Sequence, residues 1–389
     1  MDRYKRSEAH VACRAASICI LSVFASLPAA AQGLKPSDSI PQLEAAVARD
    51  SNDAQLHYRL GIAYWSRKRF DEAGKSLLTA VTIERRFADA YLALAYLPYA
   101  RRRQLMKEAA QGEVPPEWRD SVVESERLRR RAFLINPLVD LKIMGAFVPV
   151  RTGFVAALVD PFSSFVSGNY AMAYLTFNRW VGDRPRDSIP DGMLWFHGLA
   201  AGHVALYDVA ATDFQALVDR SLNVEHSDTM SPIPLRTNDF RYLLATFKNR
   251  GGHFPEAIAL YKEALGNDAG LFMAHVQMGK IFEQFKQWPD AIEHFEAAVA
   301  TNPDDPSVLL DLGVIFREAG RLQESESTLN RAMGANPRDS RVPYHLAITL
   351  QQESKVADAR AAFTHFLEIA PSRYATQISD ARVRLASLQ

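Results

Sequence analysis

The stretch from Asn238 to Pro371 repeats itself, and this repetition constrains the fold more than any other feature of the sequence. Similar residue types return every 34 residues through four units, with no insertion between them. Two small-residue positions and one large apolar position recur, at Ala245, Gly279, Gly313 and Ala347; at Ala257, Ala291, Ser325 and Ala359; and at Tyr261, Phe295, Leu329 and Phe363. A fixed period of this length predicts stacked units, because no single unit can bury its apolar face alone.

These units resemble the tetratricopeptide repeat, a helix–turn–helix module of about 34 residues. One unit carries the pattern at Leu312, Gly313, Phe316, Gly320, Leu322, Leu329, Ala332 and Pro337. Small residues such as Gly279 let two helices approach closely, large ones such as Phe295 fill the seam, and Pro303 ends the second helix. The resemblance implies an all-α fold in which helix pairs stack into a right-handed superhelical solenoid. An ordinary helical bundle is the alternative, and it does not require a fixed period.

The remaining segments are interpreted around this array, residues 238–371. We expect a linker and an N-terminal helix in 32–53, degenerate repeats with an apolar insertion in 138–237, and a C-terminal capping helix in 372–389. Residues 54–137 are predicted to hold two repeats, the second with an inserted hairpin extension. Pro98 is expected to interrupt the first helix of that second repeat.

Two arginine triplets lie in this extended repeat, at 101–103 and at 129–131. They are predicted to lie on solvated helix faces, where they pair with nearby glutamates. An anion-binding patch is the alternative.

The first 31 residues have the organisation of a secretory signal peptide. A basic opening precedes an uncharged stretch from Ala15, which ends in the small residues Ala29, Ala30 and Ala31. Cleavage after Ala31 would leave 389 − 31 = 358 residues, without either of the two cysteines, Cys13 and Cys19. The expected location is therefore periplasmic or secreted, and a retained membrane anchor is the alternative.

Residues 146–168 are apolar and rich in phenylalanine, but Pro149, Gly153 and Pro161 divide them into pieces too short to span a membrane. Two interpretations stay open. The aromatic side chains fill the core of the solenoid, or they form an exposed loop that makes peripheral contact with a membrane or docks a partner.

No catalytic motif is present in the sequence. The histidines and carboxylates are scattered, so we expect neither an enzyme nor a bound metal or cofactor. An enzyme with its site in the irregular segment 138–237 is a less favoured alternative. The formal net charge is zero, which does not favour binding to nucleic acid.

In tetratricopeptide arrays the first helix of each unit lines a concave groove that binds proteins or peptides. The resemblance therefore implies a non-enzymatic interaction scaffold with partner-binding side chains in this groove. The candidates are Tyr58, Trp65, Tyr96, Tyr99, Tyr242, Asn249, Arg250, Lys280, Arg317 and Tyr344. The Lys and Asn pair with which some members grip a C-terminal carboxylate is not assembled here.

Overall fold

The computed structural model describes residues 39–108, 117–140, 161–221, 237–303 and 305–388. The predicted signal peptide, residues 1–31, lies outside the described residues. So does most of the apolar insertion, including Phe147 and Phe154.

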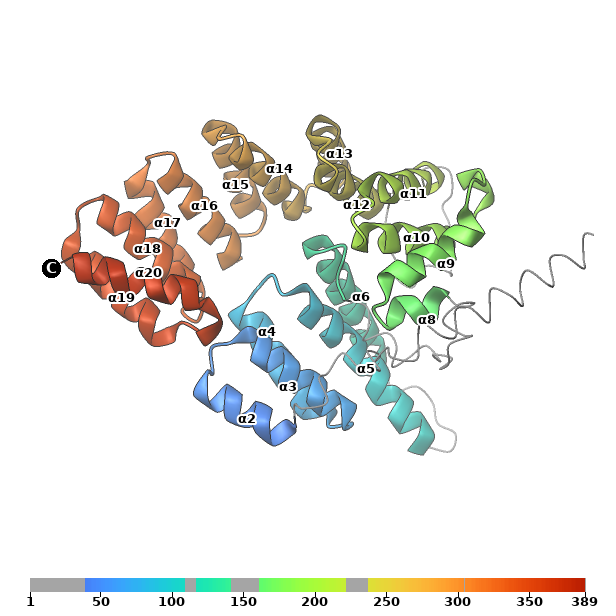
Figure 1. The fold of residues 1–389 in the computed structure, drawn as a ribbon, viewed down its shortest axis with the longest axis horizontal. Helices are drawn as coiled ribbons and strands as arrows, with labels where there is room; N and C mark the ends of the chain where they lie inside the picture. The colour runs from blue at the N-terminus through green and yellow to red at the C-terminus, as the bar shows by residue number, and fades with distance from the viewer. Residues whose placement is uncertain (1–38, 109–116, 141–160, 222–236, 304, 389) are drawn as a thin grey trace, which may run out of the picture. The chain divides into compact units, whose positions relative to one another are not determined.

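The described residues fold mainly into α-helices (Figure 1). The α-helices are α2 (Ile40–Arg49), α3 (Ala54–Ser66), α4 (Phe70–Ile83), α5 (Ala88–Glu108), α6 (Glu117–Ile135), α8 (Pro161–Val166), α9 (Tyr170–Val181), α10 (Asp191–His203), α11 (Tyr207–Ser221), α12 (Thr237–Arg250), α13 (Phe254–Asn267), α14 (Phe272–Gln284), α15 (Trp288–Thr301), α16 (Pro306–Glu318), α17 (Leu322–Ala335), α18 (Arg341–Gln352), α19 (Val356–Ile369) and α20 (Ala375–Ser387). Two short 3₁₀ helices, η2 (Arg186–Ser188) and η3 (Ser372–Tyr374), complete the described elements.

Consecutive helices pack as pairs, and most pairs pack on the next one along the chain. The exception is the pair of α5 and α6, where α6 contacts α12. Eight pairs run from α3 and α4 to α18 and α19 within the described residues, with α2 before them and α20 after them. The predicted all-α solenoid is therefore confirmed. In the regular array, helix boundaries recur with the sequence period, as at Trp288 and Leu322.

The seams inside the pairs explain why the small residues recur. A Cβ atom added at Gly279 would lie 2.8 Å from the ring of Phe295, and one at Gly313 would lie 2.6 Å from Leu329. Phe295 and Leu329 are themselves completely buried. The small residue on the first helix thus makes room for the large residue on the second, as the repeat pattern predicts.

The prediction that Pro98 interrupts its helix was wrong, because α5 continues through this residue to Glu108. A proline inside a helix loses one backbone hydrogen bond. Packing of α5 against α6 stabilises the helix in spite of this loss.

The described end of the apolar insertion lies in the core. Phe165 of α8 is completely buried, and the ring centroid of Phe162 lies 5.2 Å from that of Phe177 and 4.9 Å from that of Phe196. For residues 161–166 the structure therefore supports the core-filling interpretation.

Candidate partner-binding surfaces

Two of the predicted groove aromatics lie in the interior. Trp65 and Tyr96 are each 8% exposed. Tyr58 and Tyr99 are half-buried, and the ring centroid of Tyr58 lies 5.0 Å from that of Phe87. In this structure, the N-terminal candidates therefore present little aromatic surface to a partner.

The aromatic candidates of the regular array also form hydrogen bonds within the chain. Tyr242 is completely buried, its hydroxyl donates to the Leu134 carbonyl at 2.6 Å, and burial raises its pKa to about 12. The hydroxyl of half-buried Tyr344 donates to Asp380 at 2.8 Å. Tyr242 is therefore an interior residue that joins α12 to α6.

The polar candidates differ in how accessible they are. Arg250 on α12 and Lys280 on α14 are exposed, and Asn249 is half-buried. The Arg317 side chain is only 8% exposed, and its Nη1 lies 3.2 Å from Nδ1 of His345. Arg250 and Lys280 are thus the most exposed candidates, on the first helices of consecutive pairs, and Nη2 of Arg250 donates to Oδ1 of Asn136 at 3.1 Å.

In the second arginine triplet, Arg129 is 8% exposed, whereas the side chains of Arg130 and Arg131 are 30% and 37% exposed. The predicted solvated placement was therefore wrong for Arg129, although its predicted pairing with a glutamate is present, to Glu126 at 4.0 Å. The Arg129 guanidinium lies 5.8 Å from the ring centroids of both Tyr96 and Tyr99. Arg130 pairs with Asp239 and Asp268 at 2.8 Å each, and Arg131 with Asp305 at 3.6 Å. Because consecutive helical residues point in different directions, the triplet contacts α5 as well as residues of the regular array. Of the first triplet, Arg101 is exposed and pairs with Asp71 at 3.1 Å.

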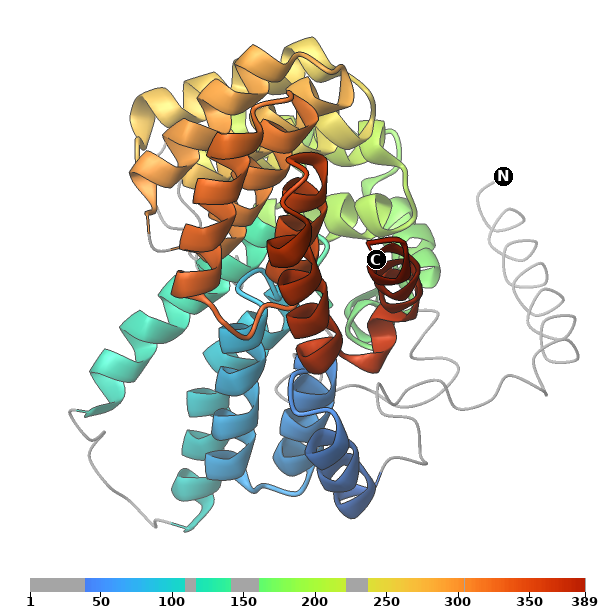
Figure 2. The ribbon, with the colours of Figure 1, turned by 90° about the vertical axis from the view of Figure 1, so that its left-hand side faces the viewer.

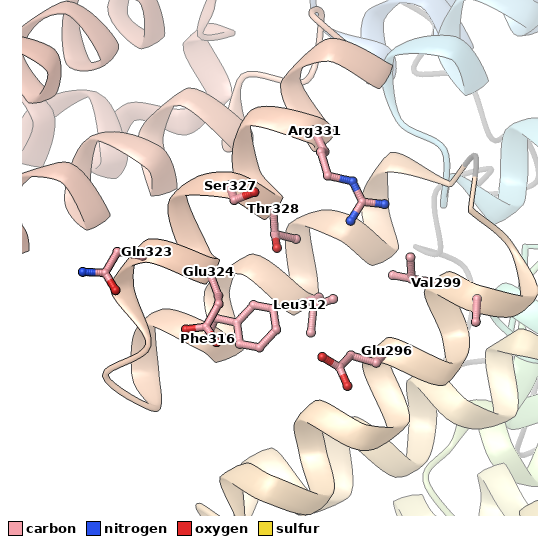
Figure 3. A pocket seen from close by; sticks show the side chains of 10 residues that line it. Glu296, Val299, Leu312, Phe316, Gln323, Glu324, Ser327, Thr328 and Arg331 are labelled. Atoms are coloured by element: carbon pink, nitrogen blue, oxygen red, sulfur yellow. The ribbon is translucent and has the colours of Figure 1, made fainter.

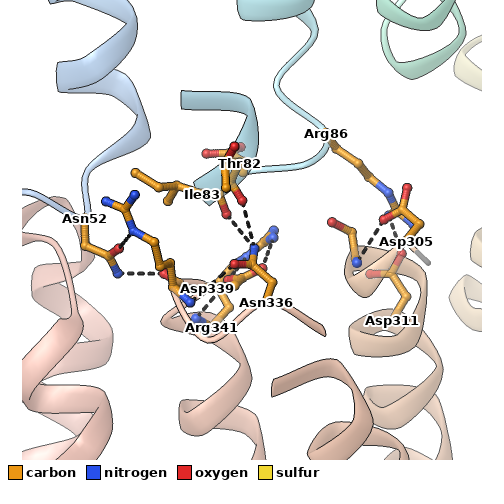
Figure 4. Close-up of polar contacts among 12 residues, drawn as sticks. Asn52, Thr82, Ile83, Arg86, Asp305, Asp311, Asn336, Asp339 and Arg341 are labelled. Carbon is orange, nitrogen blue, oxygen red and sulfur yellow. Dashed lines mark hydrogen bonds and ion pairs between the residues drawn. The ribbon is translucent and has the colours of Figure 1, made fainter. Parts of the chain in front are cut away.

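A further ion pair joins residues from distant parts of the sequence. Arg86, in the loop after α4, donates to Asp311 on α16 (Figure 4). Burial alone would raise the pKa of Asp311, but Arg86 and Lys280 outweigh it and lower the pKa. Part of the first-helix face of the regular array is therefore covered by the chain's own N-terminal half.

An open cleft of about 630 Å³ lies along α15, α16 and α17. Its floor contains Leu312 and Phe316, which are almost completely buried. Glu296 and Arg331 extend into it from α15 and α17 (Figure 3). The full lining is Glu296, Val299, Ala300, Leu312, Phe316, Gln323, Glu324, Ser327, Thr328 and Arg331.

The groove prediction missed this cleft because it considered first helices, whereas most of the lining residues lie on the second helices α15 and α17. The sequence signal that could have indicated it is the row of short side chains at Ala300, Ser327 and Thr328. Such side chains leave space between neighbouring helices.

Within the part of the chain that the structure describes, no group of three or more His, Cys, Asp or Glu side chains could hold a metal ion.

The helix pairs and their seams define a tetratricopeptide-type array, and comparison with known families agrees. Residues 27–91 and residues 283–347 each match a family model described as tetratricopeptide repeat. Tetratricopeptide repeats are therefore present in both the N-terminal and the C-terminal part of the chain. The comparison with curated proteins found no match.

Among solved structures, the chain is similar to the C-terminal part of a TPR repeat-containing protein from Cytophaga hutchinsonii. The two are 18% identical over 59% of this chain and 86% of that chain, with a TM-score of 0.48. It is also similar to MamA from Desulfovibrio magneticus RS-1, at 17% identity over 46% of this chain and 94% of that chain, with a TM-score of 0.39.

Proposed function

We propose that this protein is an exported, non-enzymatic scaffold that binds protein or peptide partners on its stacked helix pairs. The observation that carries the proposal is the array itself. In the part of the chain that the structure describes, eight helix pairs repeat a first helix, and rows of such helices serve as extended binding surfaces in repeat proteins. Tetratricopeptide repeats are generally interaction modules and not enzymes, which supports the non-enzymatic part.

Partner contact is proposed at the accessible candidates on the first helices. Arg250 and Lys280 supply exposed positive charge on consecutive first helices, and the half-buried Tyr58, Tyr99 and Tyr344 are the remaining partly accessible aromatic members of the predicted groove set. Positive charge of this kind favours an acidic or mixed-charge protein segment over an apolar one. The buried Trp65, Tyr96 and Tyr242 would position these residues without contacting the partner themselves.

Export is proposed from the predicted signal peptide. The intact mass of the protein recovered from the periplasm or the medium should correspond to a chain that begins at Gln32 or within a few residues of it. A chain that still begins at Met1 and stays with the membrane fraction would contradict export.

The membrane alternative concerns the apolar segment 146–168. No helix among the described residues is both long and apolar enough to cross a membrane. Peripheral contact through that segment is a separate hypothesis. It predicts that the protein lacking its leader co-sediments with membranes, whereas the scaffold proposal predicts that it stays in the supernatant.

The binding proposal is tested by crosslinking in the native host, followed by affinity capture and quantification of the captured proteins. Charge reversal at Arg250 and Lys280 (R250E/K280E) should reduce capture of the specific partner at least about tenfold, or 1.4 kcal/mol. Lys262→Glu is the matched control, because Lys262 is equally exposed but lies on α13, the second helix of its pair. If both variants capture the same proteins as the wild type, the first-helix surface is not the binding site.

A further inference from the structure

The loops that join helix pairs at the two ends of the array contact each other. On the N-terminal side the contact involves residues 50–53, before α3, and residues 82–86, the end of α4 with the loop after it. On the C-terminal side it involves residues 336–341, from the loop after α17 to the first residue of α18, and residues 369–373, the last residue of α19 with the segment after it. Figure 2 shows the first helices beside the last ones, and Figure 4 shows the polar side chains between them. We refer to these four segments together as the end contact.

One asparagine from the C-terminal side caps a helix of the N-terminal side. Asn336 is 5% exposed, and its Nδ2 donates to the carbonyls of Thr82 and Ile83 at 3.1 Å each. These carbonyls lie in the last turn of α4, where a helix has no partner of its own for them. Asn336 therefore supplies hydrogen bonds that α4 cannot make internally.

A second asparagine makes the reciprocal contact from the N-terminal side. Nδ2 of Asn52 donates to the carbonyl of Arg338 at 2.6 Å and to that of Ile369 at 3.1 Å. The Oδ1 atom of Asn52 accepts from Nε of Arg338 at 3.1 Å. Each end of the array thus presents an asparagine to the backbone of the other.

Ion pairs surround these amide contacts. Arg373 donates to Glu84 at 3.0 Å and lies 3.5 Å from Asp53. The backbone N–H of Ser372 donates to Asp50 at 2.8 Å. The Arg373 and Glu84 side chains are 28% and 26% exposed, so dissolved salt can reach them.

The end contact is polar, in contrast to the rest of the packing. The two smaller apolar clusters contain the buried side chains of α17–α20, and neither contains a described side chain of α2–α4. A partly open pocket of only about 10 Å³, the space of about one water molecule, lies among Asn52, Arg338 and Arg373. The two ends therefore fit closely, but little apolar surface holds them together.

We propose that the end contact is a latch that joins the first and last helix pairs and releases while the pairs themselves stay folded. Opening would expose the first-helix face of α16 around Asp311, which pairs with Arg86, and the half-buried Glu283 of α14, which interacts electrostatically with Asp311. The latch would thereby control access of a protein partner to that face, and this last step rests on the proposed function.

The latch is tested with an isosteric substitution and a matched control. Asn336→Asp keeps the shape of the side chain and its acceptor for the local turn, but it places a carboxylate against the carbonyls of Thr82 and Ile83. Asn302→Asp makes the same change one repeat earlier, where Asn302 also follows a second helix and precedes a proline. Both variants lose the same amide, and only the first loses contacts across the end contact.

The readout is the distance between spin labels on Cys substitutions of Lys75 on α4 and Asn330 on α17, both exposed. Replacing Cys13 and Cys19 with Ser removes the only native thiols. The wild type and Asn302→Asp should give one narrow distance distribution, whereas Asn336→Asp should give a longer, broader one with unchanged helix content. If Asn336→Asp retains the wild-type distance distribution, or if the wild-type distribution is already broad, the latch proposal is wrong.

Access is measured without any partner, by the rate at which a polyethylene-glycol maleimide modifies Glu283→Cys. Glu283 is half-buried on α14 and interacts electrostatically with Asp311. If the open state is about 10% populated or less in the wild type, Asn336→Asp should raise the rate about tenfold or more. Equal modification rates in the wild type and Asn336→Asp would show that the latch does not control access to this face, even if the distance between the spin labels increases. Because neither readout requires a partner, failure of the proposed function leaves both results interpretable.

Discussion

The seams inside the helix pairs and the end contact join helices by different kinds of interaction. In the seams a glycine faces a completely buried large side chain, as Gly279 faces Phe295. At the end contact, asparagines and arginines bond to backbone carbonyls and carboxylates, as Asn336 and Arg373 do. We therefore expect the seams to stay packed as long as the protein is folded, and the end contact to open and close reversibly. Apolar burial is lost only on unfolding, whereas polar contacts exchange with water at little net cost.

The largest expected effect is in the seams. Phe295→Ala should destabilise the protein by about 3–5 kcal/mol, because it removes a completely buried ring and leaves a cavity. The measurement is urea unfolding followed by far-UV circular dichroism. Phe285→Ala is the control, since Phe285 is 52% exposed and its loss should shift the midpoint little. Equal midpoints for the two variants would show that packing in the seam does not stabilise the protein.

Adding one methyl group in the seam tests the close approach of the two helices. Gly279→Ala should cost about 1–3 kcal/mol, since its Cβ would lie 2.8 Å from the Phe295 ring. Gly334→Ala on α17 meets nothing within 4 Å and should stabilise by about 0.5–1 kcal/mol, because alanine favours a helix. The two substitutions are chemically identical. Opposite changes in stability, measured by thermal unfolding, would therefore reflect the difference in packing around the two glycines. A stabilising Gly279→Ala would contradict the close approach.

His345 on α18 lies against Arg317 on α16, so its protonation tests how the packing between helix pairs tolerates an added charge. Burial, assisted by Arg317 and Arg341, lowers the pKa of His345 to about 4. The unfolded chain, with a His pKa near 6.5, therefore binds more protons between these values, and stability falls as the pH drops through this window. Between pH 7 and pH 5 the loss at this site should be about 2 kcal/mol.

The check is the free energy of unfolding of wild type and His345→Gln at both pH values. The variant should lose less stability on acidification, because glutamine does not titrate. An identical pH dependence in the two proteins would show that His345 is not held neutral by its surroundings.

The smallest expected effect is at the end contact. Asn336→Ala should cost about 1 kcal/mol, since it removes two hydrogen bonds to the carbonyls at the end of α4. Asn302→Ala, at the same position of the preceding repeat, should cost less. Chemical unfolding of both variants measures the difference, and a larger loss for Asn302→Ala would place the contribution in the local turn and not across the end contact.

The seams could be predicted from the sequence, but the end contact could not. Gly279 and Phe295 lie within one repeat, and the period assigns both to one seam because local contacts recur with the pattern. Asn336 and Thr82 are 254 residues apart, and their meeting depends on the summed rotation of all intervening pairs. No single repeat carries that information.

The same reason explains which site predictions were incomplete. The groove position of Tyr242 was assigned from the resemblance, but its burial follows from the path of α6, whose Leu134 carbonyl accepts its hydroxyl. The pairing of Arg130 with Asp239 likewise depends on where α6 lies relative to α12. The predicted interruption at Pro98 rested on the local effect of proline, and packing of α5 against α6 outweighs that effect.

The most direct test of the contrast between the two kinds of joint is hydrogen–deuterium exchange at low and at high salt. Raising the ionic strength from about 0.15 M to 1 M shortens the screening length from about 8 Å to 3 Å. Exchange should then increase in residues 50–53, 82–86, 336–341 and 369–373, while α14 and α15, around Phe295, remain as protected as before. Equal loss of protection in the seam helices and the end contact, or no change at the end contact, would contradict the account.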